Sequence, residues 1–304
     1  MEDRDVKLKE NIQNLKQKRN AVILAHNYQL GEVQDIADFA GDSLELSQRA
    51  AQTDADVIVF CGVHFMAETA SILCPDKTVL LPDVNAGCPM ADMITADELR
   101  AEKRKHPRAT VVCYVNSTAE VKAESDICCT SANAVKVVES LDCEEILFVP
   151  DYYLGQYTAA KTKKKMIFWP GYCPTHARIL PEHLTEMRRH YPQAKVVVHP
   201  ECRPEVIALA DEALSTSGIC RYARREDVRQ MVVGTEMGII HRLKKENPGK
   251  QFIPISEQAV CPNMKLITLE KMLWSLEELR PEVKVPEEIR LKAKAAVDRM
   301  LKIV

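Results

Sequence analysis

Short apolar runs recur along the chain, and each ends in polar, Gly or Pro residues. The runs VIVF from residue 57 and VVV from residue 196 are apolar on both faces of an extended strand, which is typical of strands buried in a parallel sheet. Between the runs lie stretches with helical patterning, such as GEVQDIADFA from residue 31 and RPEVIALADEAL from residue 203. Strands that alternate with helices predict parallel sheets joined by βαβ crossovers.

The apolar runs fall into three matching sets, which indicates an internal repeat. First strands begin at residues 22, 111 and 196, the next at 57, 146 and 232, and the last at 79, 166 and 252. The separations are 89 and 85, 89 and 86, and 87 and 86 residues. We therefore predict three copies of one unit of about 86 residues. The predicted fold class is α/β, with three pseudo-symmetric αβα sandwich domains whose parallel sheets surround a central active site.

The repeat also predicts the domain organisation. The first αβα repeat with an N-terminal helix is expected at 1–95, the second repeat at 96–180, the third repeat at 181–265, and C-terminal helices at 266–304. We expect the N-terminal helix and the C-terminal helices to pack on the first repeat.

Polar side chains follow the first strand of each unit. These strand-end segments are His26, Asn27 and Tyr28, then Tyr114, Val115 and Asn116, then His199, Pro200 and Glu201. Ligands of parallel sheets bind beyond the carboxyl ends of the strands, so three converging edges would place these groups around one pocket. Histidine, tyrosine and glutamate are suited to proton transfer. A single strand-end polar residue is more often a satisfied structural group, but recurrence at one repeat position favours a shared site.

Small hydroxyl residues recur about twenty positions after the start of each first strand. The segments are GDS at 41–43, TSAN at 130–133 and STSG at 215–218, and Ser43, Ser131 and Thr216 lie at the expected helix starts. Such residues are typical N-caps, and exposed helix N-termini bind carboxylate or phosphate groups. Simple capping without a ligand is the alternative for any one copy. Three such termini facing one pocket would suit a substrate with several negative charges.

One cysteine precedes a proline after the last strand of each unit. These residues are Cys88, Cys173 and Cys261, separated by 85 and 88 positions. Three thiolates brought together by the repeat fit three irons of a [4Fe-4S] cluster and leave the fourth iron open. Such an iron acts as a Lewis acid toward substrate oxygens. Zinc bound by three cysteines and a water is one alternative, and three buried thiols without a metal are another.

Composition and charge narrow the function classes. The chain has 44 acidic and 41 basic residues, a net charge of −3, which gives no reason to expect a nucleic-acid or acidic-membrane partner. Its longest segment without Asp, Glu, Lys or Arg is twelve residues, too short for a transmembrane span. The first residues are charged rather than signal-like. Eleven cysteines, an odd number without a Cys-x-x-Cys pair, favour free thiols in a reducing cytoplasm.

Several dispersed strings resemble one known family. They are AHNY at 25–28, GDS at 41–43, YVN at 114–116, PGYCPTH at 170–176, HPEC at 199–202, STSG at 215–218 and CPNMK at 261–265. Together they resemble the quinolinate synthase (NadA) family over nearly the whole chain. The resemblance implies three αβα domains around a [4Fe-4S] cluster and a transferase reaction. Iminoaspartate (iminosuccinate) and dihydroxyacetone phosphate would condense to quinolinate, with loss of phosphate and two waters, in de novo NAD biosynthesis.

The resemblance also implies roles for individual residues. The implied cluster ligands are Cys88, Cys173 and Cys261. The implied substrate contacts are His26, Ser43, Tyr114, Val115, Asn116, Ser131, His199, Pro200, Glu201 and Thr216. The implied catalytic residues are Glu201, Tyr28, His26 and His199, and His176 lies in the matching Cys-x-x-His string. A functional link to L-aspartate oxidase or aspartate dehydrogenase, which would supply iminoaspartate, is implied as well.

Two other functions fit parts of this pattern. A cluster-dependent hydro-lyase of the aconitase type also uses three cysteines and an open iron, but its ligands include a close Cys-x-x-Cys pair that this chain lacks. An iron–sulfur sensor or small-molecule-binding protein would need no carboxylate or phenol beside the open iron. Glu201 and Tyr28, at repeat-equivalent strand ends, argue against it.

Overall fold

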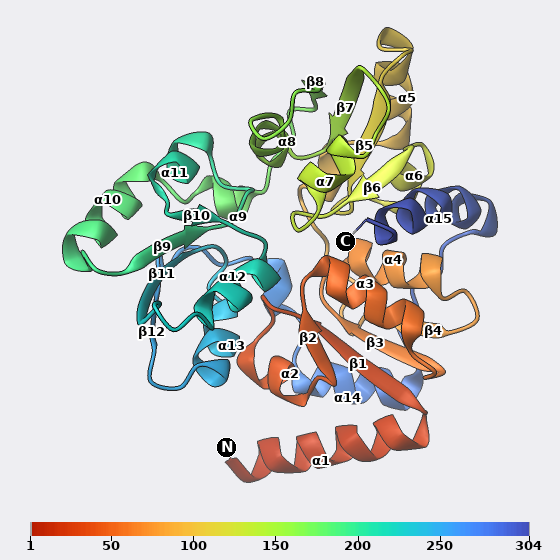
Figure 1. Ribbon diagram of the computed structural model, residues 1–304. Coiled ribbons are helices and arrows are strands. Elements are labelled where there is room, and N and C mark those ends of the chain that lie inside the picture. The colour runs from red at the N-terminus through yellow and green to blue at the C-terminus, as the bar shows by residue number, and fades with distance from the viewer. Residues whose placement is uncertain (1, 304) are drawn as a thin grey trace.

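The computed structural model describes residues 2–303 and contains three four-stranded sheets. Every strand pair within them is parallel, and each sheet has its four strands in the order second, first, third, fourth along the chain. Figure 1 shows the three sheets with their helices grouped around the middle of the molecule. The predicted α/β fold with three repeated units is confirmed.

The elements of the first unit begin with the N-terminal helix. They are α1 (Glu2–Lys18), β1 (Ala21–His26), α2 (Gly31–Ile36), β2 (Phe39–Gly41), α3 (Ser43–Gln52), β3 (Val57–Cys61), α4 (His64–Leu73), β4 (Thr78–Leu80) and the 3-10 helix η1 (Ala91–Met93). The second unit repeats this plan. Its elements are α5 (Ala96–Lys105), β5 (Thr110–Tyr114), α6 (Ala119–Ala123), β6 (Ile127–Cys129), α7 (Ala134–Glu139), β7 (Glu145–Val149), α8 (Tyr152–Ala159), β8 (Lys165–Phe168) and α9 (Pro174–Ala177).

The third unit follows the same plan and leads into the C-terminal helices. Its elements are α10 (Pro181–His190), β9 (Lys195–Val198), α11 (Pro204–Leu209), β10 (Glu212–Ala213), α12 (Thr216–Ala223), β11 (Gln230–Gly234), α13 (Ile239–Glu246), β12 (Gln251–Pro254) and the 3-10 helix η2 (Pro262–Lys265). The last helices are α14 (Leu269–Glu278) and α15 (Glu287–Leu301).

Both faces of the sheets are covered, as their apolar runs predict. In the third unit, Val197 belongs to the large core shared with the other units, whereas Val196 and Val198 belong to a separate core beneath α10 and α11. Alternate side chains of a strand point to opposite faces. Each face therefore has its own apolar contact, and the sheet lies between two helical layers.

The short strand at one edge of each sheet was not predicted from the sequence. These strands, β2, β6 and β10, have three, three and two residues. An aspartate just before each short strand links it to the first strand of its sheet. The aspartate side chain accepts a hydrogen bond from a backbone N–H of that first strand, 15 residues earlier. The donors are Ile23, Val111 and Val196, at 2.8, 2.8 and 2.6 Å. The three acceptors are Asp38, Asp126 and Asp211. The equivalence extends the repeat to single hydrogen bonds.

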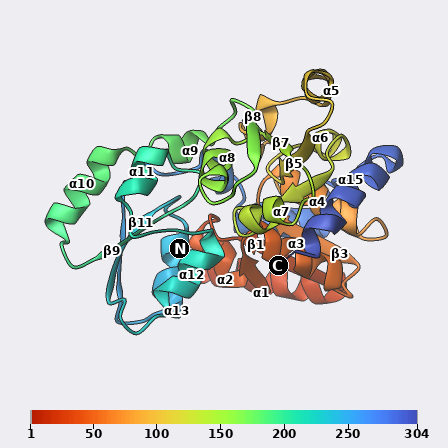
Figure 2. The same cartoon turned by 45° about the horizontal axis from the view of Figure 1, so that its top comes forward.

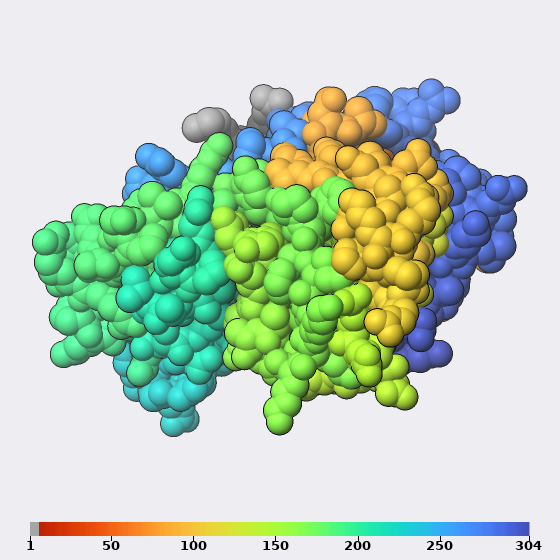
Figure 3. All heavy atoms as spheres, turned by 90° about the horizontal axis from the view of Figure 1, so that it is seen from above, coloured from red at the N-terminus to blue at the C-terminus, as the bar shows by residue number. Residues whose placement is uncertain are grey.

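The terminal helices cover different parts of the molecule. Helix α14 packs against α1 and contacts β3 of the first sheet. Helix α15, expected on the first repeat, contacts α6 and β6 of the second unit as well as α4 of the first. Its small residue Ala293 packs with Ile72 and Ala119, because an alanine lets two other helices approach closely. Figure 3 shows α15 in dark blue at the right of the second unit, with the third unit on the other side.

The third unit lies beside the open edge of the first sheet. Figures 1 and 2 both place α12 and α13 next to α2, and Figure 1 shows β2 beside them. At this junction Gln34 donates to the carbonyl of Gly238 at 2.9 Å, and Lys245 pairs with Asp35 at 2.6 Å. The carboxyl ends of the strands can therefore face one shared space.

Candidate active site

One cavity between the three units receives most of the predicted site residues. The predicted residues that line it are His26, Tyr28, Ser43, Cys88, Tyr114, Asn116, Ser131, Cys173, His199, Glu201, Thr216 and Cys261. The structure thus brings together residues up to 235 positions apart, from Cys261 back to His26. They come from strand ends and helix starts of every unit, which is where three converging parallel sheets present polar groups.

Two expected substrate contacts lie outside this lining. Val115 and Pro200 are buried, but neither is among the residues that line the cavity. Each sits between two lining residues of its strand end. Both lie in the bend or turn that follows the first strand of their unit, and only the side chains on either side of them line the cavity: Tyr114, Asn116, His199 and Glu201.

The three cysteines of the Cys-Pro motifs are half-buried and line the same cavity. Cys173 and Cys261 each occupy the N-cap position of a short helix whose first residue is proline. Burial above all, and then the charges of Glu201 and Cys261, raise the pKa of the Cys88 thiol to about 12. Burial and the charge of Glu201 also raise the pKa of the Cys173 thiol, and Cys88 adds to this rise. Thiols that line one cavity in this way oppose one another's ionisation, and a bound cationic centre would reverse the effect.

This donor set fits an iron–sulfur cluster. Three thiols reach one cavity from three separate units, and the remaining lining within residues 2–303 has polar and apolar side chains but no fourth cysteine. Three thiolates are the ligands expected for a [4Fe-4S] cluster with one iron left for substrate. The third cysteine loop is held by Glu236, whose Oε1 accepts the Cys261 N–H at 3.1 Å and pairs with Lys265 at 2.9 Å.

Glu201 lies at the centre of the polar wall. Its side chain is buried, its Oε1 accepts a hydrogen bond from the Tyr114 hydroxyl at 2.5 Å, and its Oε2 lies 2.6 Å from Nδ1 of His176. Burial alone would raise the pKa of the Glu201 carboxyl. The facing histidines and the hydrogen bonds from His176 and Tyr114 outweigh burial and hold this pKa well below its usual range. Glu201 is therefore an ionised, hydrogen-bonded base.

A continuous hydrogen-bonded chain connects Glu201 to Tyr28. His176 places its other ring nitrogen, Nε2, 2.8 Å from the Thr235 hydroxyl, which lies 2.5 Å from the Tyr28 hydroxyl. Burial and then the charge of Glu201 raise the pKa of Tyr28 well above its ordinary value. Tyr28 is thus a neutral phenol that can donate, and each group between it and Glu201 can both accept and donate a proton.

His26 and His199 occupy equivalent turns after the first strands of their units. Nδ1 of each accepts the backbone N–H two residues later: that of Tyr28 at 3.2 Å and that of Glu201 at 3.3 Å. Burial is the main cause that lowers the pKa of each ring to about 3. Both rings are neutral at physiological pH, so each carries its proton on Nε2 as a hydrogen-bond donor.

The three hydroxyl residues occupy two kinds of position. Ser43 and Thr216 are the first residues of α3 and α12, whose N-caps are Asp42 and Ser215. Ser131 lies in a turn before α7, because Asn133 Oδ1 accepts the Thr130 N–H at 2.8 Å and delays the helix to residue 134. The expected N-caps do lie in these three segments, as Asp42, Asn133 and Ser215, but only Ser215 is a hydroxyl residue. Ser43, Ser131 and Thr216 all line the cavity.

One acceptor in the wall is open to a ligand. Asn116 donates from Nδ2 to Glu201 at 3.5 Å, while its buried Oδ1 has no hydrogen-bond partner within residues 2–303. A buried polar atom without a partner costs free energy. Asn116 therefore offers an acceptor that a donor group of a bound molecule would satisfy.

Sequence reasoning missed the groups that follow the third strand of a unit. Thr235 and Glu236 come directly after β11 and carry the contacts to Tyr28, His176 and Cys261. The signal that could have found them is the same rule of strand carboxyl ends, applied to the next strand of the sheet.

Comparison with known proteins gives one consistent result. The family model for quinolinate synthetase A protein (NadA) matches residues 10–302. A quinolinate synthase of Dehalococcoides mccartyi (strain CBDB1) is 67% identical over 293 residues, 96% of this chain and 97% of that protein. Quinolinate synthases of Geotalea uraniireducens (strain Rf4) and Methanosarcina barkeri (strain Fusaro) are 59% and 58% identical, each over 97% of both chains.

Proposed function

The chain belongs to the quinolinate synthase (NadA) family of [4Fe-4S]-dependent enzymes of NAD biosynthesis, and from this premise we propose how its central cavity performs the reaction. The substrates are iminoaspartate and dihydroxyacetone phosphate, and the product is quinolinate. One observation carries the proposal: thiols from all three units line the same cavity as Glu201 and Tyr28. Family membership replaces the aconitase-type and sensor hypotheses.

Cys88, Cys173 and Cys261 would hold the cluster by three of its irons. When bound, the cluster supplies a Lewis-acidic iron with a position for a substrate oxygen or nitrogen. Glu236 and Lys265 support this arrangement because they fix the loop that carries Cys261. Such supporting contacts orient metal ligands.

The chain from Glu201 to Tyr28 carries protons between two sides of the substrate. Glu201 removes a proton from a substrate carbon or nitrogen, and Tyr28 donates one to a departing oxygen. His176 and Thr235 connect the two, so a proton taken at Glu201 can restore the one lost at Tyr28. Dehydration requires such paired removal and donation. Neutral His26 orients a substrate oxygen through Nε2–H, whereas Nε2–H of His199 lies 3.1 Å from the Ser131 hydroxyl and orients that group.

Ser43, Ser131 and Thr216 bind carboxylate or phosphate oxygens. At Thr216 the helix start adds the positive end of the helix dipole. At α3 the side chain of Asp42 already accepts the N–H groups of Leu44 and Glu45, so Ser43 offers chiefly its hydroxyl. Tyr114 and Asn116 complete the wall, with Asn116 Oδ1 as acceptor for a substrate donor. Val115 and Pro200 stay predictions from the family resemblance.

Iminoaspartate arises by two-electron oxidation of the amine of aspartate, so an enzyme of that class supplies this substrate. L-aspartate oxidase and aspartate dehydrogenase both fit, and we propose either as the functional partner. We also propose a cytoplasmic location. Within residues 2–303, no helix has the length and apolar character needed to cross a membrane.

An anaerobic assay tests the proposal. The holoenzyme should form quinolinate only when iminoaspartate and dihydroxyacetone phosphate are both present. The Glu201→Gln variant should keep its cluster and lose ~10²- to 10⁴-fold in kcat, because an amide cannot accept the substrate proton. Iron content and visible absorption serve as controls for cluster loading. Quinolinate formation by Glu201→Gln at the parent rate would contradict the assignment of the base.

A further inference from the structure

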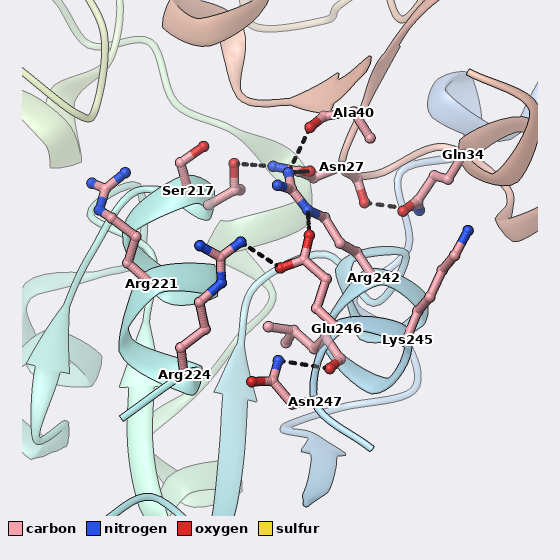
Figure 4. Close-up of polar contacts among 12 residues, drawn as sticks. Asn27, Gln34, Ala40, Ser217, Arg221, Arg224, Arg242, Lys245, Glu246 and Asn247 are labelled. Atoms are coloured by element: carbon pink, nitrogen blue, oxygen red, sulfur yellow. Dashed lines mark hydrogen bonds and ion pairs between the residues drawn. The ribbon is translucent and has the colours of Figure 1, made fainter. Parts of the chain in front are cut away.

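A single arginine joins the third unit to the first behind the cavity wall. Arg242 lies on α13, and its side chain is 16% exposed. Its Nη1 donates to Asn27 Oδ1 and to the carbonyl oxygen of Ala40, each at 2.7 Å, both in the first unit. Figure 4 shows the guanidinium between these two acceptors and Glu246, which accepts from its Nε at 2.6 Å.

Arg242 determines which way the amide of Asn27 points. A guanidinium only donates hydrogen bonds, so the atom of Asn27 that faces it must be the acceptor Oδ1. The amide nitrogen is then on the opposite side, where Nδ2 donates to Oγ1 of Thr216 at 2.9 Å. Asn27 is fully buried. No water can take over either contact without opening the junction between the units.

The orientation of Asn27 in turn determines the role of the Thr216 hydroxyl. Thr216 is 2% exposed and lines the cavity. Its Oγ1 accepts from Asn27, so its own hydrogen is directed elsewhere, and the cavity is the side on which a ligand lies. A hydroxyl in this state donates to a carboxylate or phosphate oxygen.

We infer that Arg242 is a positioning residue that, through Asn27, fixes the Thr216 hydroxyl as a hydrogen-bond donor toward an anionic group of the substrate. The inference rests on the proposed contact between Thr216 and substrate. Without Arg242, Asn27 can turn its amide so that Oδ1 faces Thr216. The hydroxyl then donates to Asn27 and loses its bond to the substrate.

The position of Arg242 is itself fixed from the other side. Glu246 accepts from Arg242 with Oε1 and from Arg224 with Oε2, the latter at 2.9 Å. In Figure 4, Arg224, which directly follows α12, reaches Glu246 and does not touch Asn27. Arg224 is therefore a matched control: it carries the same charge in the same cluster but is not part of the path to Thr216.

The first experiment reverses the polarity of Asn27 in the anaerobically purified holoenzyme. Asn27→Asp keeps the size of the side chain and its contact with Arg242, but it only accepts, so Thr216 must donate to it. The KM for one of the two substrates should rise about tenfold or more, the effect of losing a hydrogen bond to a charged group, with little change in kcat. In a Thr216→Val background the same substitution should have no further effect on KM.

The second experiment compares two arginines, with iron content and far-UV circular dichroism as checks on folding. Arg242→Met should raise the same KM several-fold, and Arg224→Met should leave it within about twofold. An equal rise in KM for Arg242→Met and Arg224→Met would show a general charge effect and overturn the inference. So would a rise in KM that Asn27→Asp still causes in the Thr216→Val background. If Thr216→Val raises KM while Asn27→Asp and Arg242→Met do not, only the inference fails. If Thr216→Val leaves KM unchanged, the proposed substrate contact fails with it.

Discussion

At the scale of single residues, the site is a connected set of groups rather than a collection of separate ones. Thr235 joins Tyr28 to His176 at 2.5 and 2.8 Å, and His176 joins Glu201 at 2.6 Å. Each group thereby fixes the protonation state and orientation of the next. Residues such as Thr235, which the cavity does not expose directly, are as much a part of the chemistry as those that line it.

Removal of the Thr235 hydroxyl tests this connection. Thr235→Val has the same shape but cannot pass a proton between Tyr28 and His176, so we expect kcat to fall by ~10²-fold. Thr235→Ser retains the hydroxyl and should retain most of the activity. Steady-state kinetics of holoenzymes with equal iron content provide the comparison. A Thr235→Val enzyme with the parent kcat would show that protons reach Tyr28 by another route.

The buried neutral histidines predict a pH dependence of stability. The pKa of His26 is about 3 when folded against an ordinary value of 6.5, so the unfolded chain binds more protons below that value. Above pH 6.5, His26 is neutral in both the folded and the unfolded chain, and its ionisation does not reduce stability. As the pH falls below 6.5, the unfolded chain gains a proton that the folded protein does not, so the free energy of unfolding decreases. Between about pH 7.5 and 5.5 this one group accounts for about 1.4 kcal/mol.

The variant His26→Asn isolates that contribution, because Asn keeps an acceptor for the Tyr28 N–H but does not titrate. Urea unfolding gives the free energy of unfolding of each protein at about pH 7.5 and 5.5. Between these two pH values, His26→Asn should lose about 1.4 kcal/mol less stability than the parent. The difference between the two proteins is the relevant quantity, since other buried acids such as Asp151, whose pKa burial raises, titrate in both. Identical pH dependence would mean that His26 is protonated in the folded protein.

The residues that were predictable from the sequence are those that recur once in every unit. Cys88, Cys173 and Cys261 were found because they share a position after the last strand, and all three line the cavity. Thr235 and Glu236 could not be found in this way. Their counterparts are Gly62 and Val63 after β3, and Pro150 and Asp151 after β7. Only Asp151 shares a carboxylate with Glu236, so no signal that recurs in all three units marks the position.

At the scale of elements, side-chain hydrogen bonds form the short edge strands that apolar patterning does not predict. The long strands were predicted because runs such as VIVFC are buried along their whole length. The edge strands β2, β6 and β10 have too few residues to show a pattern. They form because Asp38, Asp126 and Asp211 each bind a backbone N–H of the neighbouring strand. Three aspartates 15 residues after the same strand position would have been the sequence signal.

Asp126 offers the clearest test of this edge. The variant Asp126→Ala leaves the buried N–H of Val111 without its acceptor, and we expect a loss of about 1–3 kcal/mol in the free energy of unfolding. Asp142→Ala, at an exposed position of the same unit, should change stability by less than about 0.5 kcal/mol. Urea unfolding of both variants gives the comparison. Equal stabilities would show that the edge strand does not depend on the aspartate.

At the scale of the whole molecule, three similar units make one site that none of them contains alone. Each unit contributes one Cys-Pro motif, one polar strand end and one hydroxyl residue to the cavity. The second and third units differ from the first in the side chains at these positions, which turns a symmetric framework into an asymmetric wall. The overall arrangement was predictable because the repeat spacing survives in the sequence. The asymmetric pairing of Glu201 with His176 was not, because it joins two units through side chains alone.

Anaerobic counting of iron and sulfide, together with visible absorption, tests the central claim most directly. The parent should hold ~4 irons and ~4 sulfides per chain, and Cys88→Ser should lose the cluster's broad absorption. Cys143→Ser is the matched control, since Cys143 is also half-buried but does not line the cavity, and it should match the parent. Full iron content in Cys88→Ser, or its loss in Cys143→Ser, would contradict a cluster held jointly by the three units.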